Sequence, residues 1–335
     1  MADVPDQTAM RDPLTQYPRP DFDKQPQPAP GLAREMNPRP DHGEHSHRGA
    51  GRLKGRRAMI TGADSGIGRA TAIAFTRESA DVAMNYLQRE EGDAREVVQW
   101  IESAGRKAVP LPGDIADEAF CTRLVDDAVH ALGGLDMLVN VAGKQVYVED
   151  IADLTTGQLE ATFRTHVFAM FWLCKAALPH LPRGGTILNT TSIQSYQPSP
   201  GLLDYASTKA AITAFTHAFA KQVIERGVRV DAVAPGLICT PLQPSGGQPR
   251  EKVEAFGSAA PMKRPGQPAE LAPIYVLLAS QESSYVTGEV YGVTGGNHLP
   301  RPAGLHGATP GQSPGRIGVR DRVRRTRRHG NAATL

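Results

Sequence analysis

Short apolar runs alternate with longer amphipathic segments along residues 55–295. Apolar runs bounded by Gly, Pro, Asn or Asp are typical of buried strands. We expect strands at Arg57–Thr61, Asp81–Tyr86, Ala108–Leu111, Leu135–Val141, Thr186–Thr190, Val228–Ala234 and Val290–Val293, and helices at Arg69–Glu78, Ala94–Ser103, Ala119–Leu132 and Gln158–Leu178. This alternation predicts an α/β Rossmann fold, a doubly wound parallel sheet of about seven strands with helices on both faces.

The alternating pattern is absent at both ends of the chain. Residues 1–50 contain nine prolines and few apolar residues, which predicts an extended arm that lies on the body or on a neighbouring subunit. Residues 301–335 lack apolar periodicity and predict a disordered basic tail. That tail is either a stretch translated beyond the natural end or a genuine segment that contacts RNA or acidic lipid. Residues 51–300 then form the one folded domain, in which residues 240–268 predict a mobile connection with a short helix.

Composition and charge exclude several classes of protein. No apolar run approaches the length of a membrane span, and the N-terminus lacks the apolar centre of a secretory signal. The tail has eight arginines and one acid, a net charge of +7, so the total of +2 leaves −5 on residues 1–300. A mildly acidic body predicts no broad nucleic-acid surface. The widely spaced Cys121, Cys174 and Cys239 predict packing roles in a reducing, cytoplasmic setting.

Three histidines gather near the end of the arm. His42, His45 and His47 lie beside Asp41 and Glu44, so a metal site is one interpretation. The other is a solvated polar turn, which we favour because an unstructured stretch offers a metal no fixed geometry. We therefore predict no metal site.

A glycine-rich turn follows the first expected strand. Residues 61–68 read TGADSGIG and precede an expected helix. In such a unit, glycines allow the backbone to approach a pyrophosphate, and the helix N-terminus favours its charge. The turn therefore predicts a dinucleotide site with contacts from Thr61, Gly62, Asp64, Ser65, Gly66, Ile67 and Gly68.

The end of the second expected strand bears on which dinucleotide binds. An acid there favours NAD through the ribose 2′-hydroxyl, whereas an arginine accommodates the 2′-phosphate of NADP. Residues 85–87 read NYL and are followed by Gln88 and Arg89. This favours NADP, and NAD stays open because Glu90 and Glu91 come next.

Tyr205 and Lys209 lie four residues apart at the start of an expected apolar helix, so they share one face. A neighbouring ammonium stabilises phenolate and lowers the pKa of a tyrosine. Tyr205 can then exchange a proton with a substrate oxygen as general acid and base. Ser192 follows the strand Thr186–Thr190, and its hydroxyl can bind the same oxygen. We predict that Ser192 and Tyr205 contact substrate and that Lys209 activates Tyr205.

Taken together, these residues resemble the short-chain dehydrogenase/reductase family. The resemblance covers about residues 52–298 and includes TGADSGIG, GDIAD, NVAG, YASTK and PGLICT. The proline-rich arm and the segments LLDYASTKAA, TPLQPSGGQP and SSYVTGEVYGVTGG resemble one branch of it. That branch is labelled glucose/ribitol dehydrogenase-like or general-stress oxidoreductase.

The resemblance implies further contacts and an assembly. It implies that Asp114 holds the adenine edge, that Asn140, Ala142 and Gly143 line the cofactor cleft, that Lys209 also bonds the nicotinamide ribose, and that Pro235, Gly236 and Thr240 contact the nicotinamide end. The loop after Thr240 would close over substrate. Members of this family usually form homotetramers or dimers, often through the helix that carries the tyrosine.

Two positions depart from the family pattern. Val141 in NVAG replaces a common asparagine, and His166 stands where the family carries its catalytic asparagine, which is thought to hold a water in a proton relay. Histidine also binds water and exchanges protons near neutral pH, but it is bulkier. Either His166 is a working substitute or the relay is impaired.

These features support one leading function and two alternatives. The leading one is an enzyme that transfers hydride reversibly between NADP or NAD and an aldehyde, ketone or polyol. The first alternative is a cofactor-binding sensor or scaffold with weak or no catalysis. The second is a nucleic-acid binder that acts through the basic tail.

Overall fold

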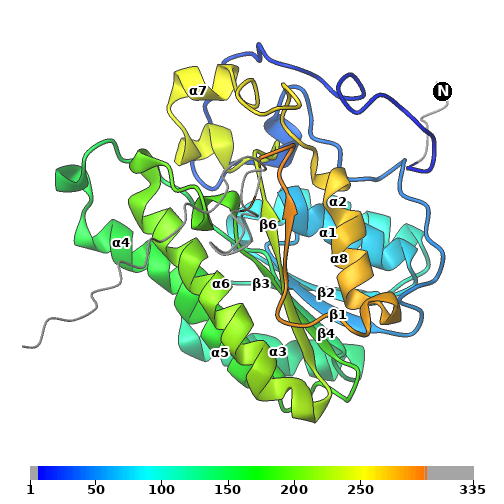
Figure 1. The fold of residues 1–335 in the computed structure, drawn as a ribbon. Helices are drawn as coiled ribbons and strands as arrows, with labels where there is room; N and C mark the ends of the chain where they lie inside the picture. The colour runs from blue at the N-terminus through cyan, green and yellow to red at the C-terminus, as the bar shows by residue number, and fades with distance from the viewer. Residues whose placement is uncertain (1–6, 298, 300–335) are drawn as a thin grey trace, which may run out of the picture. The chain divides into compact units, whose positions relative to one another are not determined.

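The computed structural model describes residues 7–297 and residue 299. Seven parallel strands form one sheet in the order β3-β2-β1-β4-β5-β6-β7 (Figure 1). They are β1 (Arg57–Thr61), β2 (Asp81–Tyr86), β3 (Ala108–Pro112), β4 (Met137–Asn140), β5 (Thr186–Thr190), β6 (Arg229–Pro235) and β7 (Val290–Val293). The reversal of strand order at β1 and β4 creates a crevice at the carboxyl edge. The predicted Rossmann-type sheet is confirmed.

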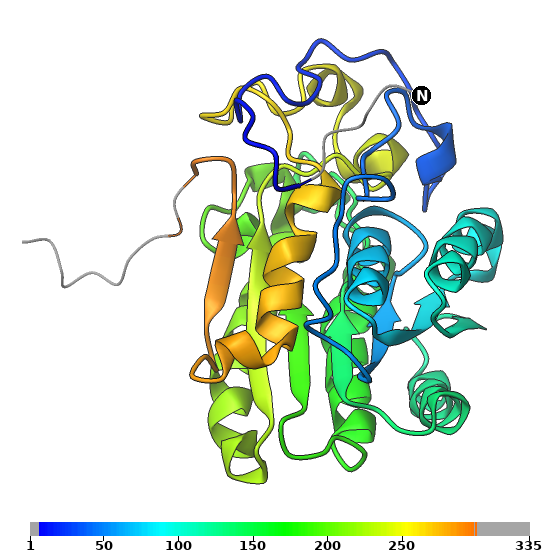
Figure 2. The same ribbon diagram turned by 90° about the vertical axis from the view of Figure 1, so that its right-hand side faces the viewer.

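Helices cover both faces of the sheet (Figures 1 and 2). One layer holds α1 (Gly66–Arg77), α2 (Glu91–Ser103) and α8 (Ala272–Ala279), and the other holds α3 (Glu118–Leu132), α5 (Ala169–Ala177) and α6 (Leu203–Val223). Each layer packs over its own apolar cluster on the sheet. The remaining α-helices are α4 (Thr156–Phe163), before α5, and α7 (Arg250–Glu254), in the loop after β6. Within the described residues, no helix is both long and apolar enough to span a bilayer.

Two helical elements differ from the expectation. The sequence pattern missed α8 because its residues, APIYVLLA, are apolar on every side and so show no amphipathic period. The single helix expected at Gln158–Leu178 is α4 and α5 joined through a π-helical turn, Arg164–Phe168. Such turns leave no mark on apolar spacing, and they recur at functional sites.

The proline-rich arm lies on the body of the same chain. In Figures 1 and 2 it is the dark-blue segment that runs past α7 above the carboxyl ends of the strands. Ala33 is fully buried there, and contacts group the chain up to Leu299 as one compact unit. The predicted basic tail, residues 301–335, falls outside the described residues.

His42 and His47 are buried whereas His45 is exposed, so the expectation of a solvated turn is wrong for two of the three histidines. His42 Nδ1 lies 3.2 Å from Glu44 Oε1, and His47 Nε2 lies 3.6 Å from Glu78 Oε1. His45 packs edge-on against Trp100, with ring centroids 5.2 Å apart. The three histidine side chains therefore contact different partners. In the part of the chain that the structure describes, no three His, Cys, Asp or Glu side chains gather as metal ligands.

Candidate active site

A cleft of about 350 Å³ opens at the carboxyl edge of the sheet, where ligands of open α/β sheets bind. The residues that line the cleft come from the glycine turn, from the ends of β2, β5 and β6, and from the start of α6. Among the predicted site residues, the lining includes Gly62, Asp64, Ser65, Gly66, Ile67, Gly68, Asp114, Ala142, Gly143, His166, Ser192, Tyr205, Lys209, Pro235, Gly236 and Thr240. Residues that lie far apart in the sequence therefore meet in one cavity.

Thr61 and Asn140 lie behind this wall. Thr61 Oγ1 accepts hydrogen bonds from the amides of Val141 at 3.1 Å and Ala142 at 3.2 Å, which joins the ends of β1 and β4. Asn140 Nδ2 donates to Asn189 Oδ1 at 2.9 Å, between β4 and β5. The two side chains support the cleft from below, and direct contact with the cofactor stays a prediction for them.

The glycine turn has the shape that a pyrophosphate needs. Gly62 and Gly66 adopt φ of +63° and +49°, and a Cβ on Gly62 would lie 2.8 Å from the Ala142 Cα. A Cβ on Gly68 would lie 2.0 Å from the Gly62 carbonyl oxygen. The Ser65 side chain does not cap α1, so the first-turn amides remain available to an anion. The glycine turn can therefore accommodate the pyrophosphate of a dinucleotide.

Buried acids gather at the end of the cleft near β2. Burial raises the pKa values of both Asp64 and Glu90, and the nearby Asp64 carboxyl contributes to the rise at Glu90. Glu90 Oε2 accepts from the Leu87 amide at 2.8 Å, so this carboxyl is turned toward the backbone. Arg89 is exposed and lines the same end of the cleft.

Tyr205, Ser192 and Lys209 meet at the other end of the cleft. Tyr205 and Ser192 both line this end of the cleft, and the Ser192 side chain lies close enough to lower the pKa of the Tyr205 phenol. Lys209 Nζ lies 5.3 Å from the centroid of the Tyr205 ring and donates to the Thr190 carbonyl at 3.0 Å. The predicted i, i+4 pairing on one face of α6 is therefore present, and Ser192, which follows β5, supplies the hydroxyl that completes the group.

Burial has the largest effect on the pKa values of both Tyr205 and Lys209. It raises the pKa of Tyr205 to about 12, although the nearby Ser192 side chain lowers that value, and it lowers the pKa of Lys209 to about 7. Burial is thus the largest influence on the Tyr205 pKa, and the activation of Tyr205 by Lys209 stays a prediction. Both side chains are less than a tenth exposed, and removing a charge from water outweighs their mutual attraction. Tyr205 is a protonated phenol at neutral pH.

His166 lies on the π-helical turn and contacts a neighbouring loop. Its Nε2 accepts from the Lys144 amide at 3.0 Å and lies 2.8 Å from the Lys144 carbonyl oxygen. Burial, and then the charge of Lys209, lower its pKa well below the ordinary value. The imidazole is therefore neutral, and its edge faces the Tyr205 ring with centroids 5.4 Å apart. This geometry suits a residue that positions the wall of the cleft.

Several lining residues escaped the sequence analysis. The polar side chains of Lys144, Gln145, Gln194, Gln243 and Gln248 and the arm residues Ala29 and Pro30 also line the cleft. They belong to loops without a recurrent motif, and the arm reaches the cleft only through the tertiary fold. The only feature of the sequence that pointed toward these lining residues is the proline-rich composition of the arm, which favours a stiff extended segment.

Comparisons with known proteins agree with this geometry. A family model described as enoyl-(acyl carrier protein) reductase (adh_short_C2) matches residues 62–298. The chain is 60% identical over 290 residues to the uncharacterized oxidoreductase YghA of Escherichia coli (strain K12), covering 87% of this chain and 99% of that protein. It is 42% identical over 272 residues to glucose and ribitol dehydrogenase of Daucus carota, covering 80% and 93%.

Among solved structures, the chain resembles a short-chain dehydrogenase from Burkholderia cenocepacia J2315 in complex with NADP. The TM-score is 0.68 at 34% identity, with 73% of this chain and 98% of that chain covered. The residues matched by the family model, 62–298, include most of the glycine turn and all of Ser192, Tyr205 and Lys209. This chain belongs to the short-chain dehydrogenase/reductase family of oxidoreductases, close to the branch that includes YghA and glucose/ribitol dehydrogenase.

Proposed function

We propose that this protein is an NADP(H)-dependent oxidoreductase that interconverts an aldehyde or ketone and the corresponding alcohol, including polyols. The observation that carries the proposal is the convergence of Ser192, Tyr205 and Lys209 in the lining of the same cleft as the glycine turn, with Lys209 Nζ 5.3 Å from the Tyr205 ring centroid. A bound reduced nicotinamide supplies hydride to the substrate carbon. Ser192 orients the substrate oxygen, and the Tyr205 hydroxyl donates a proton to it.

Three observations favour NADP over NAD as the cofactor. Glu91 accepts from the Tyr86 hydroxyl at 2.7 Å, and Glu90 bonds the Leu87 amide, so both acids after β2 are engaged elsewhere. Arg89 is exposed at the cleft and available to a 2′-phosphate. The Burkholderia cenocepacia relative was solved with NADP.

We also propose that the protein assembles as a homotetramer or dimer through α5 and α6. Phe168, at the end of the π-helical turn, is 43% exposed, and Phe171 on α5 is 51% exposed. Phe171 packs edge-on against Phe215 of α6, with centroids 4.5 Å apart, and Phe215 contacts Phe219, both of these being half-buried. An aromatic strip with two exposed members marks an interaction surface, and its position beside the tyrosine-bearing helix fits a second copy of the chain.

The experiment that tests the activity is a nicotinamide absorbance assay. Purified full-length protein is screened with NADPH and NADH against aldehydes and ketones, and with NADP and NAD against polyols. We expect turnover of at least one carbonyl compound, with a preference for the phosphorylated cofactor. Cofactor binding without turnover across the panel would favour the sensor or scaffold alternative.

A further inference from the structure

We propose that residues 27–34 of the arm, here called the strap, form the outer wall of the cofactor cleft and retain the bound dinucleotide. The strap does so by joining the loop after β6 to the start of α2, across the mouth of the cleft. This inference rests on the proposed function, because it assigns a retention device to the same site. Neither the motifs nor the resemblance suggested any role for this segment.

The first anchor of the strap is the loop formed by residues 241–256, here called the lid. The Gln27 amide donates to the Pro244 carbonyl at 3.1 Å. Gly31 fits against the lid so closely that a Cβ there would lie 2.8 Å from the Pro241 carbonyl oxygen and 3.0 Å from the Ser245 Cβ. Just before the strap, the Phe22 amide donates to the Glu254 carbonyl at 2.9 Å.

The second anchor is α2, on the opposite side of the cleft. The Ala33 amide donates to Asp93 Oδ2 at 2.6 Å, and the Arg34 guanidinium lies 3.9 Å from the other oxygen of that carboxylate. The Asp93 side chain is fully buried. A hydrogen bond to a buried carboxylate is strong and costly to leave unmade, so this end of the strap is held firmly.

Between the anchors, the strap faces the cleft itself. Ala29 and Pro30 line the cavity together with Arg89 and Glu90 from the end near β2 and Gln243 from the lid. Prolines at 28 and 30 restrict the backbone, so little entropy is lost when the segment is fixed. The Leu32 amide donates to Gln27 Oε1 at 2.6 Å, which closes the strap on itself.

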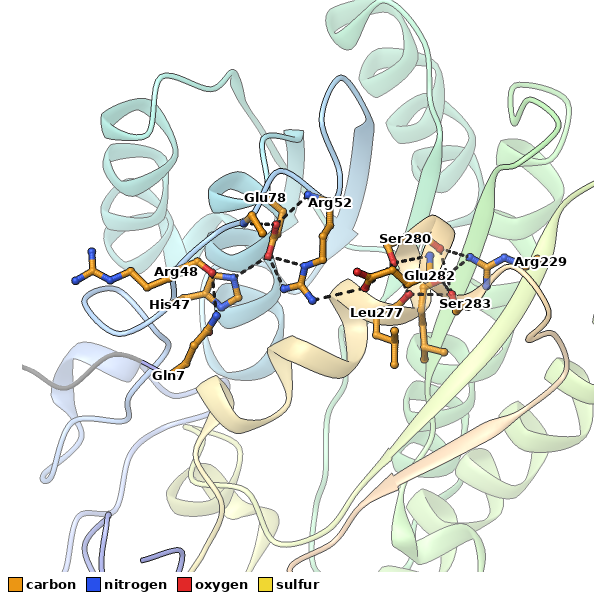
Figure 3. Close-up of polar contacts among 12 residues, drawn as sticks. Gln7, His47, Arg48, Arg52, Glu78, Arg229, Leu277, Ser280, Glu282 and Ser283 are labelled. Atoms are coloured by element: carbon orange, nitrogen blue, oxygen red, sulfur yellow. Dashed lines mark hydrogen bonds and ion pairs between the residues drawn. The ribbon is translucent and has the colours of Figure 1, made fainter. Parts of the chain in front are cut away.

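The chain beyond the strap is fixed to the body as well. Glu44 Oε1 lies 3.0 Å from the Arg69 guanidinium on α1. Further along, Glu78 accepts from the Ala50 amide at 2.8 Å and the Arg52 amide at 3.0 Å and pairs with His47 (Figure 3). The strap is thus a bridge held on both sides of the cleft, and a bound dinucleotide would lie beneath it.

The sharpest test compares two glycines that share a backbone conformation. Gly31 has φ of +80° against the lid, whereas Gly51 has φ of +77° with open space around it. Alanine costs similar backbone strain at both positions, but only Gly31→Ala pushes the strap off the lid. NADPH release from full-length wild type and both variants is followed by stopped-flow fluorescence after displacement with excess NADP.

We expect Gly31→Ala to release NADPH about tenfold faster than wild type, a ratio equal to about 1.4 kcal/mol. Gly51→Ala should stay within about twofold of wild type. If Gly31→Ala released NADPH at the wild-type rate, or if both variants released it equally faster than wild type, the strap would not retain the cofactor and the proposal would fail. If wild type binds neither NADPH nor NADH, the proposed function fails instead, so the two failures are distinguishable.

Hydrogen exchange in the wild-type protein supplies a readout that needs no variant. The Leu32 and Ala33 amides are hydrogen bonded within and beneath the strap. Saturating NADPH should slow their exchange, because the closed strap is the form that retains cofactor. The Lys54 amide, bonded to the Gly51 carbonyl outside the strap, should not respond. Unchanged exchange at Leu32 and Ala33 would contradict the proposal even if Gly31→Ala failed to fold.

Discussion

Tyr205 and Lys209 show how burial alters the chemistry that helix spacing alone suggests. The i, i+4 spacing places the ammonium beside the phenol, but the cleft removes both groups from water and keeps Tyr205 protonated. A protonated phenol is the form that carbonyl reduction requires. Ser192 lines the same end of the cleft, where we propose that its hydroxyl orients the substrate oxygen toward the phenol.

The buried Lys209 predicts a specific dependence of stability on pH. Its pKa is about 7 in the native state and near 10.5 when unfolded. Between these values the unfolded chain binds a proton that the native state has released, so stability rises with pH. Relative to Lys209→Met, wild type should gain up to about 1.4 kcal/mol per pH unit from about pH 7.5 to about pH 9.5.

Urea denaturation of both proteins across this pH range measures the effect. Lys221→Met, at an exposed position of the same helix, serves as the control and should follow wild type. Parallel curves for wild type and Lys209→Met would show that the Lys209 pKa is not lowered by burial.

His166 predicts a contrast between two substitutions. The His166 Nε2 atom can hydrogen bond either the backbone N–H or the backbone C=O of Lys144, but not both at once. An asparagine side chain at this position could accept from the Lys144 N–H and donate to the Lys144 C=O together. We expect His166→Asn to keep kcat/KM within about threefold and His166→Ala to lose about tenfold or more. Because the imidazole is neutral, His166→Asn should show the wild-type pH profile above about pH 6. A wild-type rate in His166→Ala would remove the positioning role.

At the scale of elements, the N-terminal arm is part of the fold. Its contacts reach α1, α2 and the lid, and Glu78 at the end of α1 is the main anchor of its last residues. Glu78 is fully buried and holds the Arg52 guanidinium and two backbone amides (Figure 3). A buried carboxylate such as that of Glu78 stabilises the fold only when all of its hydrogen-bond and ion-pair partners are present.

Glu78 therefore predicts sensitivity to acid. Its hydrogen bonds from Arg52 and from the backbone hold its pKa at about 2, against an ordinary value of 4.5. A lowered native pKa contributes stability that is present above the unfolded value and is lost as pH falls through this window. The melting temperature of wild type should therefore fall more steeply with acidification than that of Glu78→Gln.

The matched control for this effect is Glu282→Gln. Glu282 also pairs with Arg52, at 3.8 Å, but its side chain is 55% exposed, and exposed pairs contribute little. At neutral pH, Glu78→Gln should destabilise the protein by about 3 kcal/mol, whereas Glu282→Gln should leave it unchanged. Equal behaviour of the two variants would contradict the anchoring role of Glu78.

At the scale of the whole molecule, the sequence predicted the features that depend on local patterns. All seven strands were found within two residues of their ends, because each is a short apolar run bounded by breakers. The glycine turn and the Tyr205–Lys209 spacing were predictable for the same reason. The contact of His166 with Lys144 and the arrival of Pro30 at the cleft were not, since both depend on segments that only folding brings together.

The proposed assembly gives a prediction at the same scale. Phe171→Glu places a charge in the exposed aromatic strip of α5 and α6 and should reduce the molar mass measured by light scattering to that of a smaller species. Met10→Glu, which alters an even more exposed apolar residue in the arm, should leave the mass of the assembly unchanged. A monomeric wild type, or an unaltered Phe171→Glu assembly, would exclude this interface.

The most direct measurement compares wild type and Tyr205→Phe with one carbonyl substrate, recording NADPH oxidation and, in parallel, NADPH binding by fluorescence. The substitution removes only the phenol hydroxyl from the cleft. We predict that turnover falls by about a thousandfold or more while the dissociation constant for NADPH changes by less than about threefold. Turnover at the wild-type rate in Tyr205→Phe would contradict the proposed role of Tyr205 as proton donor.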